Sequence, residues 1–472
     1  MERLKIVGHI QPKASKDIRR SQIGLGFEKL DRNVFDPNKA YPFVAQTGVK
    51  WARLQSGWQR TETEKGVYDF AWLDSIVDNI IAIGVEPWLC LCYGNQLYTP
   101  AAREHFGAVG CPPIHTQEER DAWDKYVRAT VEHFKGRIHY YEIWNEPDGQ
   151  HCWKHGPNPV ELGAFNIATA KACKETDPDC EVLGFCTCRD NRFSFLDYLC
   201  ETGLCDYIDG MTYHSYRIQD AEFENSFKIM DEVRQKHNPK LKIVQGESGT
   251  QSRGDGNGAL RRAAWTPLKQ AKFLLRHLLV DIGNGVEFSS YFSCMDMVEA
   301  LHGKPGDVST YLDYGYFGIL GADFDEEGHS TGEYTPKMSF KALQNLCSVL
   351  CNEYDQVNFP VESVILHSDR VWGDDMNFDE ARKYSFRKPN GSMGMFYWKS
   401  SHILTDTYEG TVSIQIPNYW LKDTKVRLAN MLTGEIYEIP ENMISKEKLY
   451  TKFMNIPITD YPMLLTLGDF ID

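Results

Sequence analysis

The sequence predicts an α/β protein, with a (β/α)8 TIM barrel followed by a C-terminal all-β sandwich domain. Three observations lead to this fold class. Eight short apolar segments alternate with helical patterns up to about residue 350, polar residues follow the carboxyl ends of these segments, and short strands separated by turns then take over. Strands that alternate with helices favour a closed parallel sheet. We expect the barrel at residues 18–350 and the sandwich at residues 355–472, with residues 1–17 adding to the sandwich.

The predicted barrel strands are short and apolar. They lie at residues 23–27, 49–54, 86–92, 139–144, 181–186, 207–213, 242–246 and 286–292. Apolar residues recur at three- and four-residue steps between them, as expected of helices that pack one face against a sheet. The clearest of these helices are expected at residues 71–83, 118–135, 159–175, 223–237 and 267–282.

The predicted sandwich strands are marked by alternation and by turns. Residues 411–416 alternate with a period of two, and residues 432–435 (Leu-Thr-Gly-Glu) read as a hairpin turn. Further strands are expected at residues 361–367, 392–398, 425–431, 435–439 and 463–467.

Composition and net charge limit the classes of molecule that the protein is expected to bind. The chain has 472 residues and a formal net charge of −15, which argues against nucleic acid or an anionic membrane as the main partner. It has no apolar stretch long enough for a transmembrane helix and no signal peptide, and its 13 cysteines are scattered. We therefore expect a cytoplasmic location with free thiols. The sequence leaves homo-oligomerisation open.

Two glutamates at strand ends carry the functional prediction. Residues 143–147 read Ile-Trp-Asn-Glu-Pro and place Glu146 beside Asn145 at the end of a buried strand. About a hundred residues later, residues 246–249 (Gly-Glu-Ser-Gly) place Glu247 at the end of another. Cleavage of a glycosidic bond needs such a carboxyl pair, and Asn145 suits a sugar 2-hydroxyl. We expect burial to raise the pKa of Glu146 so that it acts as a general acid.

These motifs resemble those of the retaining glycoside hydrolases of clan A, and most closely those of family 39, which includes β-xylosidases and α-L-iduronidases. The resemblance implies a (β/α)8 barrel with Glu146 as acid/base and Glu247 as nucleophile. It also implies that Arg53, at the end of the second strand, keeps the nucleophile ionised. His214 and Tyr216, after the sixth strand, are implied as neighbours of the nucleophile and the sugar.

Further substrate-binding candidates follow other strand ends. Glu28 follows the first strand and Asp296 the eighth, and both are candidates for binding sugar hydroxyls. Many clan members end the eighth strand with a tryptophan that carries the sugar, whereas this chain offers Tyr291 or Phe292. The Gly-Glu-Ser-Gly context of Glu247 also departs from the family pattern.

The expected function is retaining, exo-acting hydrolysis of equatorial O-glycosidic bonds in a glycoside or oligosaccharide, without a cofactor or metal. Three alternatives stay open. The first is an endo-acting glycanase of the same clan, which would need an open groove with several aromatic subsites. The others are a non-catalytic carbohydrate-binding barrel and a barrel enzyme that uses paired carboxylates for unrelated proton transfer.

Overall fold

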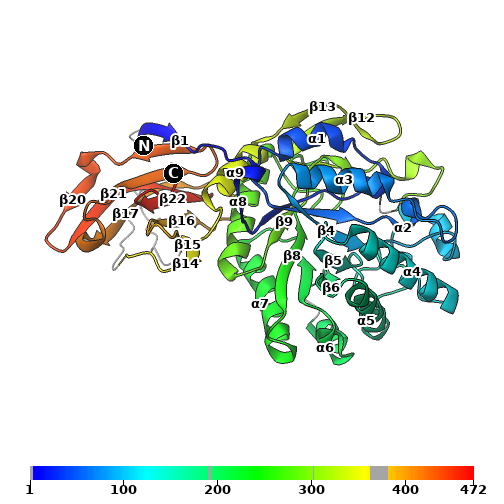
Figure 1. The fold of residues 1–472 in the computed structure, drawn as a ribbon. Coiled ribbons are helices and arrows are strands. Elements are labelled where there is room, and N and C mark those ends of the chain that lie inside the picture. The colour runs from blue at the N-terminus through cyan, green and yellow to red at the C-terminus, as the bar shows by residue number, and fades with distance from the viewer. Residues whose placement is uncertain (1–3, 190–192, 301, 362–380, 472) are drawn as a thin grey trace.

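The chain folds into a closed eight-stranded parallel barrel joined to a β-sandwich (Figure 1). The structure is a computed structural model that describes residues 4–189, 193–300, 302–361 and 381–471. All eight predicted barrel strands are found, in chain order around the barrel. They are β2 (Ile23–Gly26), β3 (Trp51–Gln55), β4 (Glu86–Leu91), β5 (Tyr140–Ile143), β6 (Glu181–Thr187), β7 (Gly210–His214), β8 (Lys242–Ser248) and β9 (Ser289–Tyr291). The predicted fold class is confirmed.

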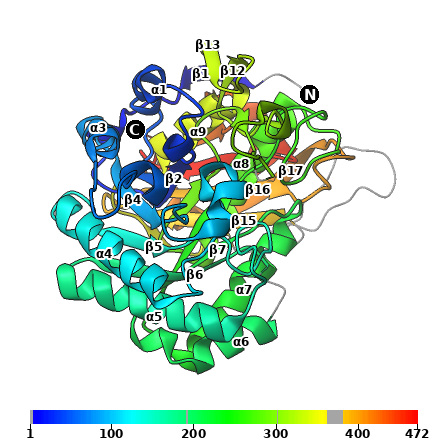
Figure 2. The ribbon, with the colours of Figure 1, turned by 90° about the vertical axis from the view of Figure 1, so that its right-hand side faces the viewer.

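Helices surround the barrel strands (Figure 2). The described helices are α1 (Pro37–Val44), α2 (Trp58–Thr61), α3 (Ala71–Ala82), α4 (Gln117–Phe134), α5 (Pro159–Thr176), α6 (Phe193–Glu201), α7 (Asp220–His237), α8 (Pro267–Asn284) and α9 (Met338–Val349). Local sequence sets their ends: Thr116 and Glu119 form a capping box at the start of α4, and Gly285 ends α8 with a left-handed φ of 91°. Five of these helices were predicted from the sequence.

Short strands follow the last barrel strand. They are β10 (Met297–Val298), which pairs with β11 (Tyr314–Gly315), and β12 (Leu320–Phe324), which pairs with β13 (Ser330–Pro336). The β12–β13 hairpin leads into α9, which packs against α8. The chain after β9 thus covers part of the barrel before it reaches the sandwich.

The sandwich consists of a seven-stranded and a three-stranded antiparallel sheet. The larger sheet has the order β1 (Lys5–His9), β19 (Glu435–Glu438), β18 (Val426–Asn430), β22 (Met463–Leu467), β16 (Met393–Lys399), β15 (Ala381–Arg387) and β14 (Asp355–Gln356). The smaller has the order β17 (Glu409–Pro417), β21 (Tyr450–Thr459) and β20 (Ile444–Lys446). Strands β15 and β21 were not predicted, and the strand predicted at 361–367 falls almost wholly outside the described residues.

Strand β1 pairs with β19, so the start of the chain adds an edge strand to the larger sheet. We propose a division into a barrel unit of residues 18–350 and a sandwich unit of residues 355–472 with residues 1–17. This division is consistent with α9 ending at Val349 and β14 beginning at Asp355.

A buried ion pair and a buried hydrogen bond join the two units at α8 and α7, and a second ion pair, between Arg276 and Asp220, lies within the barrel unit. The Lys272 ammonium lies 2.8 and 2.9 Å from the two carboxylate oxygens of Asp460, and Arg276 Nε donates to Asp220 at 2.8 Å. The Trp398 indole, on β16, also donates to Asp220 at 2.8 Å. Because these carboxylates are buried and paired, the sandwich is held against the barrel by directed contacts as well as apolar packing.

Within the described residues, no helix combines the length and the apolar character that crossing a bilayer requires. All 13 cysteines are free.

Candidate active site

Two glutamates face each other at the carboxyl end of the barrel. Glu146 lies on the loop just after β5, Glu247 lies near the end of β8, and a carboxylate oxygen of each lies within 4.8 Å of the other. Both are largely buried and line a cavity of about 380 Å³. The backbone is strained here, because Trp144 and Glu146 adopt left-handed φ values of 63° and 48°. Such strain costs about 1–3 kcal/mol per residue and clusters at functional sites.

Arg53, on β3, lies beneath these glutamates and is fully buried. Its Nε donates to Glu142 at 2.7 Å, its Nη1 donates to Glu247 at 2.7 Å, and its Nη2 donates to Asn145 at 2.9 Å. Only a guanidinium can make three such bonds in one plane. It thereby fixes Glu247 and Asn145 relative to the barrel wall.

Glu247 is bonded through both carboxylate oxygens. Oε2 accepts from Arg53, and Oε1 accepts from the Tyr216 hydroxyl at 2.5 Å. His214 Nδ1 lies 3.8 Å from Oε2. A carboxylate fixed in this way, beside a permanent cation, has the position and charge that a nucleophile requires. The sequence-predicted residues Arg53, Asn145, His214, Tyr216 and Glu247 are therefore brought together.

Glu146 is bonded by two histidines, one at each oxygen. His214 Nδ1 lies 2.8 Å from Oε1, and His151 Nε2 forms a hydrogen bond with Oε2. Burial alone would raise the pKa of Glu146, but the two imidazoles outweigh it and hold that pKa below its usual range. The prediction of a raised pKa for Glu146 was wrong, because the contact with His151, which folds back from the loop after β5, follows no pattern in the sequence.

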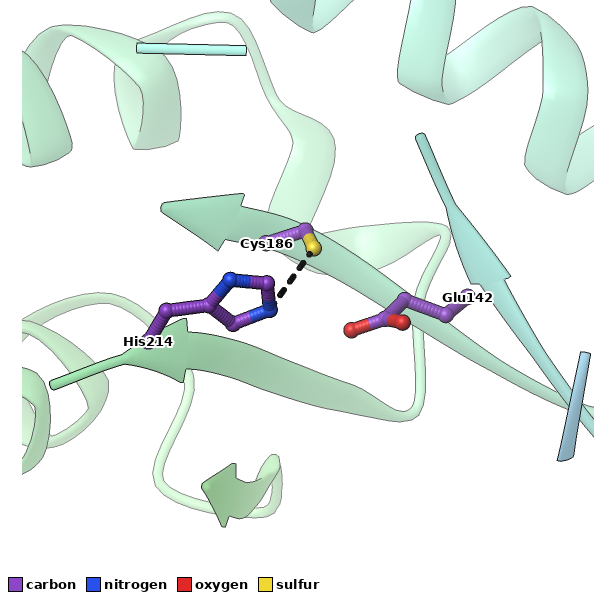
Figure 3. Close-up of side chains that lie close together, drawn as sticks. All are labelled: Glu142, Cys186 and His214. Carbon is purple, nitrogen blue, oxygen red and sulfur yellow. Dashed lines mark hydrogen bonds between the residues drawn. The ribbon is translucent and has the colours of Figure 1, made fainter. Parts of the chain in front are cut away.

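A second layer of polar groups lies around His214 (Figure 3). Glu142 comes from β5, Cys186 from β6 and His214 from β7, and His214 Nε2 lies 3.4 Å from the Cys186 sulfur. Their ligand atoms lie within 4.8 Å of one another, as metal ligands would. However, Arg53 already donates to Glu142 and lies 3.5 Å from Cys186 Sγ through Nη2. These three side chains therefore surround the Arg53 guanidinium and do not suit a metal ion.

The remaining predicted residues divide into two sets. Glu28 and Phe292 line the cavity, and Phe292 packs edge-to-face on Phe317 at 5.2 Å between ring centroids. Tyr291 and Asp296 do not line it. Tyr291 is buried, and its hydroxyl is 3.5 Å from the Thr250 carbonyl oxygen.

Asp296 is used structurally, since it accepts from Lys337 Nζ at 2.6 Å and from the Gly318 amide at 2.9 Å. The carboxylate that does line the cavity after β9 is Glu299, three residues further on, and Lys29 Nζ lies 3.3 Å from it. Sequence alone could not separate these two acids, because both follow the eighth barrel strand within a few residues of each other.

Glu28 lies in an environment that opposes its ionisation. The side chain is buried, neither carboxylate oxygen has a hydrogen-bond partner in the protein, and Arg53 Nη1 is 3.6 Å away. Burial, with repulsion from Glu247, raises the pKa of Glu28 to about 8. At neutral pH it is therefore a carboxylic acid able to donate as well as accept a hydrogen bond.

Comparison with known proteins agrees with this geometry. The model of the family described as "Glycosyl hydrolases family 39" matches residues 45–246. A β-xylosidase of Geobacillus stearothermophilus is 24% identical over 285 residues, which cover 54% of this chain and 53% of that protein. The match thus spans about half the length of this curated relative.

Solved structures share the fold. A family 39 glycoside hydrolase from Bacteroides cellulosilyticus WH2 superposes with a TM-score of 0.65 at 16% identity, covering 95% of this chain and 81% of that chain. A monomeric β-xylosidase from Caulobacter crescentus CB15 gives 0.57 at 14% identity, covering 98% of both chains. These comparisons confirm the resemblance to family 39 that the sequence motifs predict.

Proposed function

We propose that the chain is a retaining, exo-acting glycosidase that cleaves equatorial O-glycosidic bonds of β-D or α-L sugars. The observation that carries this proposal is the facing pair, Glu146 and Glu247, whose oxygens approach within 4.8 Å. Retaining enzymes place their two carboxyl groups about 5–5.5 Å apart, whereas inverting enzymes leave about 6.5–9.5 Å for a water molecule.

In the first step Glu247 attacks the anomeric carbon while Glu146 protonates the leaving oxygen. In the second step Glu146 takes a proton from water, which attacks the same carbon and releases Glu247. Arg53 and Tyr216 fix Glu247 through its two oxygens, which leaves its position little freedom before the attack. Asn145, held by Arg53, is placed to bind the sugar 2-hydroxyl.

The size and walls of the cavity support exo action. About 380 Å³ is at the small end of the range for small-molecule sites. Arg32 lines both this cavity and a neighbouring one of about 470 Å³, and its Nη2 donates to Gln55 at 2.5 Å. Because Arg32 is buried and hydrogen-bonded, it would block a sugar chain from extending from one cavity into the other. An endo-acting enzyme needs a continuous groove. The β-xylosidases among the similar proteins make a β-D-xyloside the first substrate to test.

The proposal is tested with a panel of aryl glycosides, including 4-nitrophenyl β-D-xyloside, and the variants Glu146→Ala and Glu247→Ala. One sugar should be cleaved, both variants should lose activity, and azide should rescue them with opposite product stereochemistry. Glu287→Gln serves as control, because Glu287 is an exposed glutamate just before β9, at the opposite end of the barrel. Full activity of Glu247→Ala would refute the nucleophile assignment.

The mode of cleavage is decided by products. Exo action on a short xylo-oligosaccharide should release single sugars from the first time point. An early mixture of internal fragments would instead support the endo-acting alternative, and binding without any cleavage would support a carbohydrate-binding barrel.

A further inference from the structure

His151 is a residue of the site that the two-glutamate mechanism does not use. It lies on the loop after β5 and lines the cavity, with about a quarter of its side chain exposed. Its Nε2 is bonded to Glu146 Oε2, while His214 takes the other oxygen. In the free protein, each carboxylate oxygen of Glu146 therefore has a nitrogen partner.

The fold makes room for this contact. A side chain at Gly149 would place its Cβ 2.3 Å from His151 Cε1 and 2.7 Å from its Nδ1. Only glycine therefore lets the imidazole fold back over the turn onto Glu146. The carbonyl of His151 is also fixed, since Lys154 Nζ donates to it at 3.3 Å.

The groups that face His151 are mostly acidic or neutral. Glu146 and Asp148 belong to its own loop, Cys188 follows β6 with its sulfur within 4.8 Å of the His151 and Glu146 ligand atoms, and Cys152 is the next residue. His214 from β7 and Glu247 from β8 lie on the far side of Glu146. The Lys154 ammonium also lies near His151, where it donates a hydrogen bond to the backbone carbonyl of His151. These surroundings favour an imidazolium on His151.

We infer that His151 stores the proton that Glu146 delivers to the leaving oxygen, an inference that rests on the proposed role of Glu146 as acid/base. Burial opposes a charge on His151, but its contacts with the Cys152 side chain and the Glu146 carboxylate together raise the pKa of His151 to about 11. The pair thus keeps one proton far above the pH at which an isolated glutamate loses it.

The proton balance closes over one turnover. As the bond between the anomeric carbon and the leaving oxygen breaks, its electron pair stays on that oxygen. The Nε2 proton of His151 then moves to Glu146 Oε2 and on to the oxygen, while Glu247 bonds the anomeric carbon. When water attacks, its proton passes to Glu146 and back to His151, and Glu247 leaves with its bonding electrons. His151 acts here through Glu146 and is a positioning and proton-holding residue.

His151→Gln tests this role, because the amide keeps a donor for Glu146 Oε2 but cannot hold an extra proton. With an alkyl glycoside or oligosaccharide, whose leaving group needs a proton, wild-type kcat/KM, taken relative to its value for a 2,4-dinitrophenyl glycoside at the same pH, should stay constant to pH 10. In His151→Gln the pH at which kcat/KM declines on the alkaline side should be lower by at least two units. At pH 9 the kcat/KM of the variant should therefore be at least tenfold below that of the wild type. With a 2,4-dinitrophenyl glycoside, which departs unprotonated, kcat/KM should change less than threefold.

Two controls use the same loop. His155→Gln changes an exposed histidine outside the cavity and should leave both profiles unchanged. Gly149→Ala keeps His151 but displaces its ring, and it should reproduce the profile of His151→Gln. An unshifted basic limb, or an equal loss of activity with both leaving groups, would overturn the inference.

An activity-independent measurement separates this inference from the proposed function. In ¹³C-histidine-labelled protein, the His151 signal, assigned through His151→Gln, should remain that of an imidazolium to pH 10. In Glu146→Gln the pKa of His151 should fall toward its ordinary value of 6.5, because the carboxylate that supports the imidazolium is gone. Titration near 6.5 in the wild type would overturn the proton store even if glycosides are cleaved. If no glycoside is cleaved but His151 stays charged, only the proposed function fails.

Discussion

Glu28→Gln should make the protein more stable at alkaline pH, because the buried carboxyl of Glu28 resists ionisation. Its pKa is about 8 in the folded protein against 4.5 for an ordinary glutamate. Below pH 4.5 the group is protonated in both the folded and unfolded states, so it adds no pH dependence. Between pH 4.5 and 8 only the unfolded state ionises, so the free energy of unfolding falls as pH rises. Above pH 8 the loss is complete.

The size of the loss follows from the shift. At about 1.4 kcal/mol per pH unit, a shift from 4.5 to about 8 corresponds to roughly 5 kcal/mol. An unfolding entropy of about 2 cal/mol/K per residue gives roughly 1 °C per kcal/mol for 472 residues. The Tm of Glu28→Gln should therefore exceed that of the wild type by about 5 °C at pH 9. At pH 4.5 the two should agree within about 1 °C.

Thermal unfolding of both proteins, followed by differential scanning fluorimetry from pH 4.5 to 9 at constant ionic strength, measures this difference. Glu287→Gln, an exposed change, controls for the loss of one carboxylate from the net charge. A Tm difference that does not vary with pH, or a variant that is less stable at pH 9, would refute the claim that Glu28 is held neutral by its surroundings.

Three further results are expected. Arg53→Lys keeps the charge but loses at least two of three short bonds, each worth about 1.5–3 kcal/mol, so kcat/KM on the cleaved glycoside should fall at least 100-fold. Lys272→Met should cost about 3–5 kcal/mol by leaving Asp460 unpaired, whereas Lys272→Met with Asp460→Leu should unfold in urea close to the wild type. Asp296→Asn should lower Tm by weakening its bond to Lys337, yet change KM less than twofold, because Asp296 lies outside the cavity.

The barrel could be predicted because its strands are buried on both faces. Such strands read as short apolar runs between amphipathic helices, and neither signal depends on distant contacts. In the sandwich, β15 carries Arg382, Lys383 and Arg387 among its seven residues, so its composition hides it. Arg382 is nevertheless held in place, since Nη1 donates to Glu224 on α7. Tertiary contacts of this kind are invisible in a local pattern.

The candidate site was predictable to the extent that it follows strand ends. Glu146, Glu247 and His214 lie at or just after strand ends, where a parallel barrel brings side chains together, and Arg53 lies in the middle of β3. His151 comes from a loop whose path depends on Gly149, and its contact with Glu146 could not be read from spacing. Asp296 was misplaced for a related reason, since its carboxylate is bonded by Lys337 and the Gly318 amide, two partners that are distant in sequence.

Two features of the candidate site cost the folded chain stability. Trp144 and Glu146 adopt left-handed backbone, and Glu28 lies buried without a hydrogen-bond partner. A fold selected for stability alone would place glycine at such turns and an apolar residue at position 28. Such costs persist at functional sites because a bound substrate can recover them. A sugar hydroxyl bonded to Glu28 would recover part of this cost, since it supplies the hydrogen-bond partner that the Glu28 carboxyl lacks in the free protein.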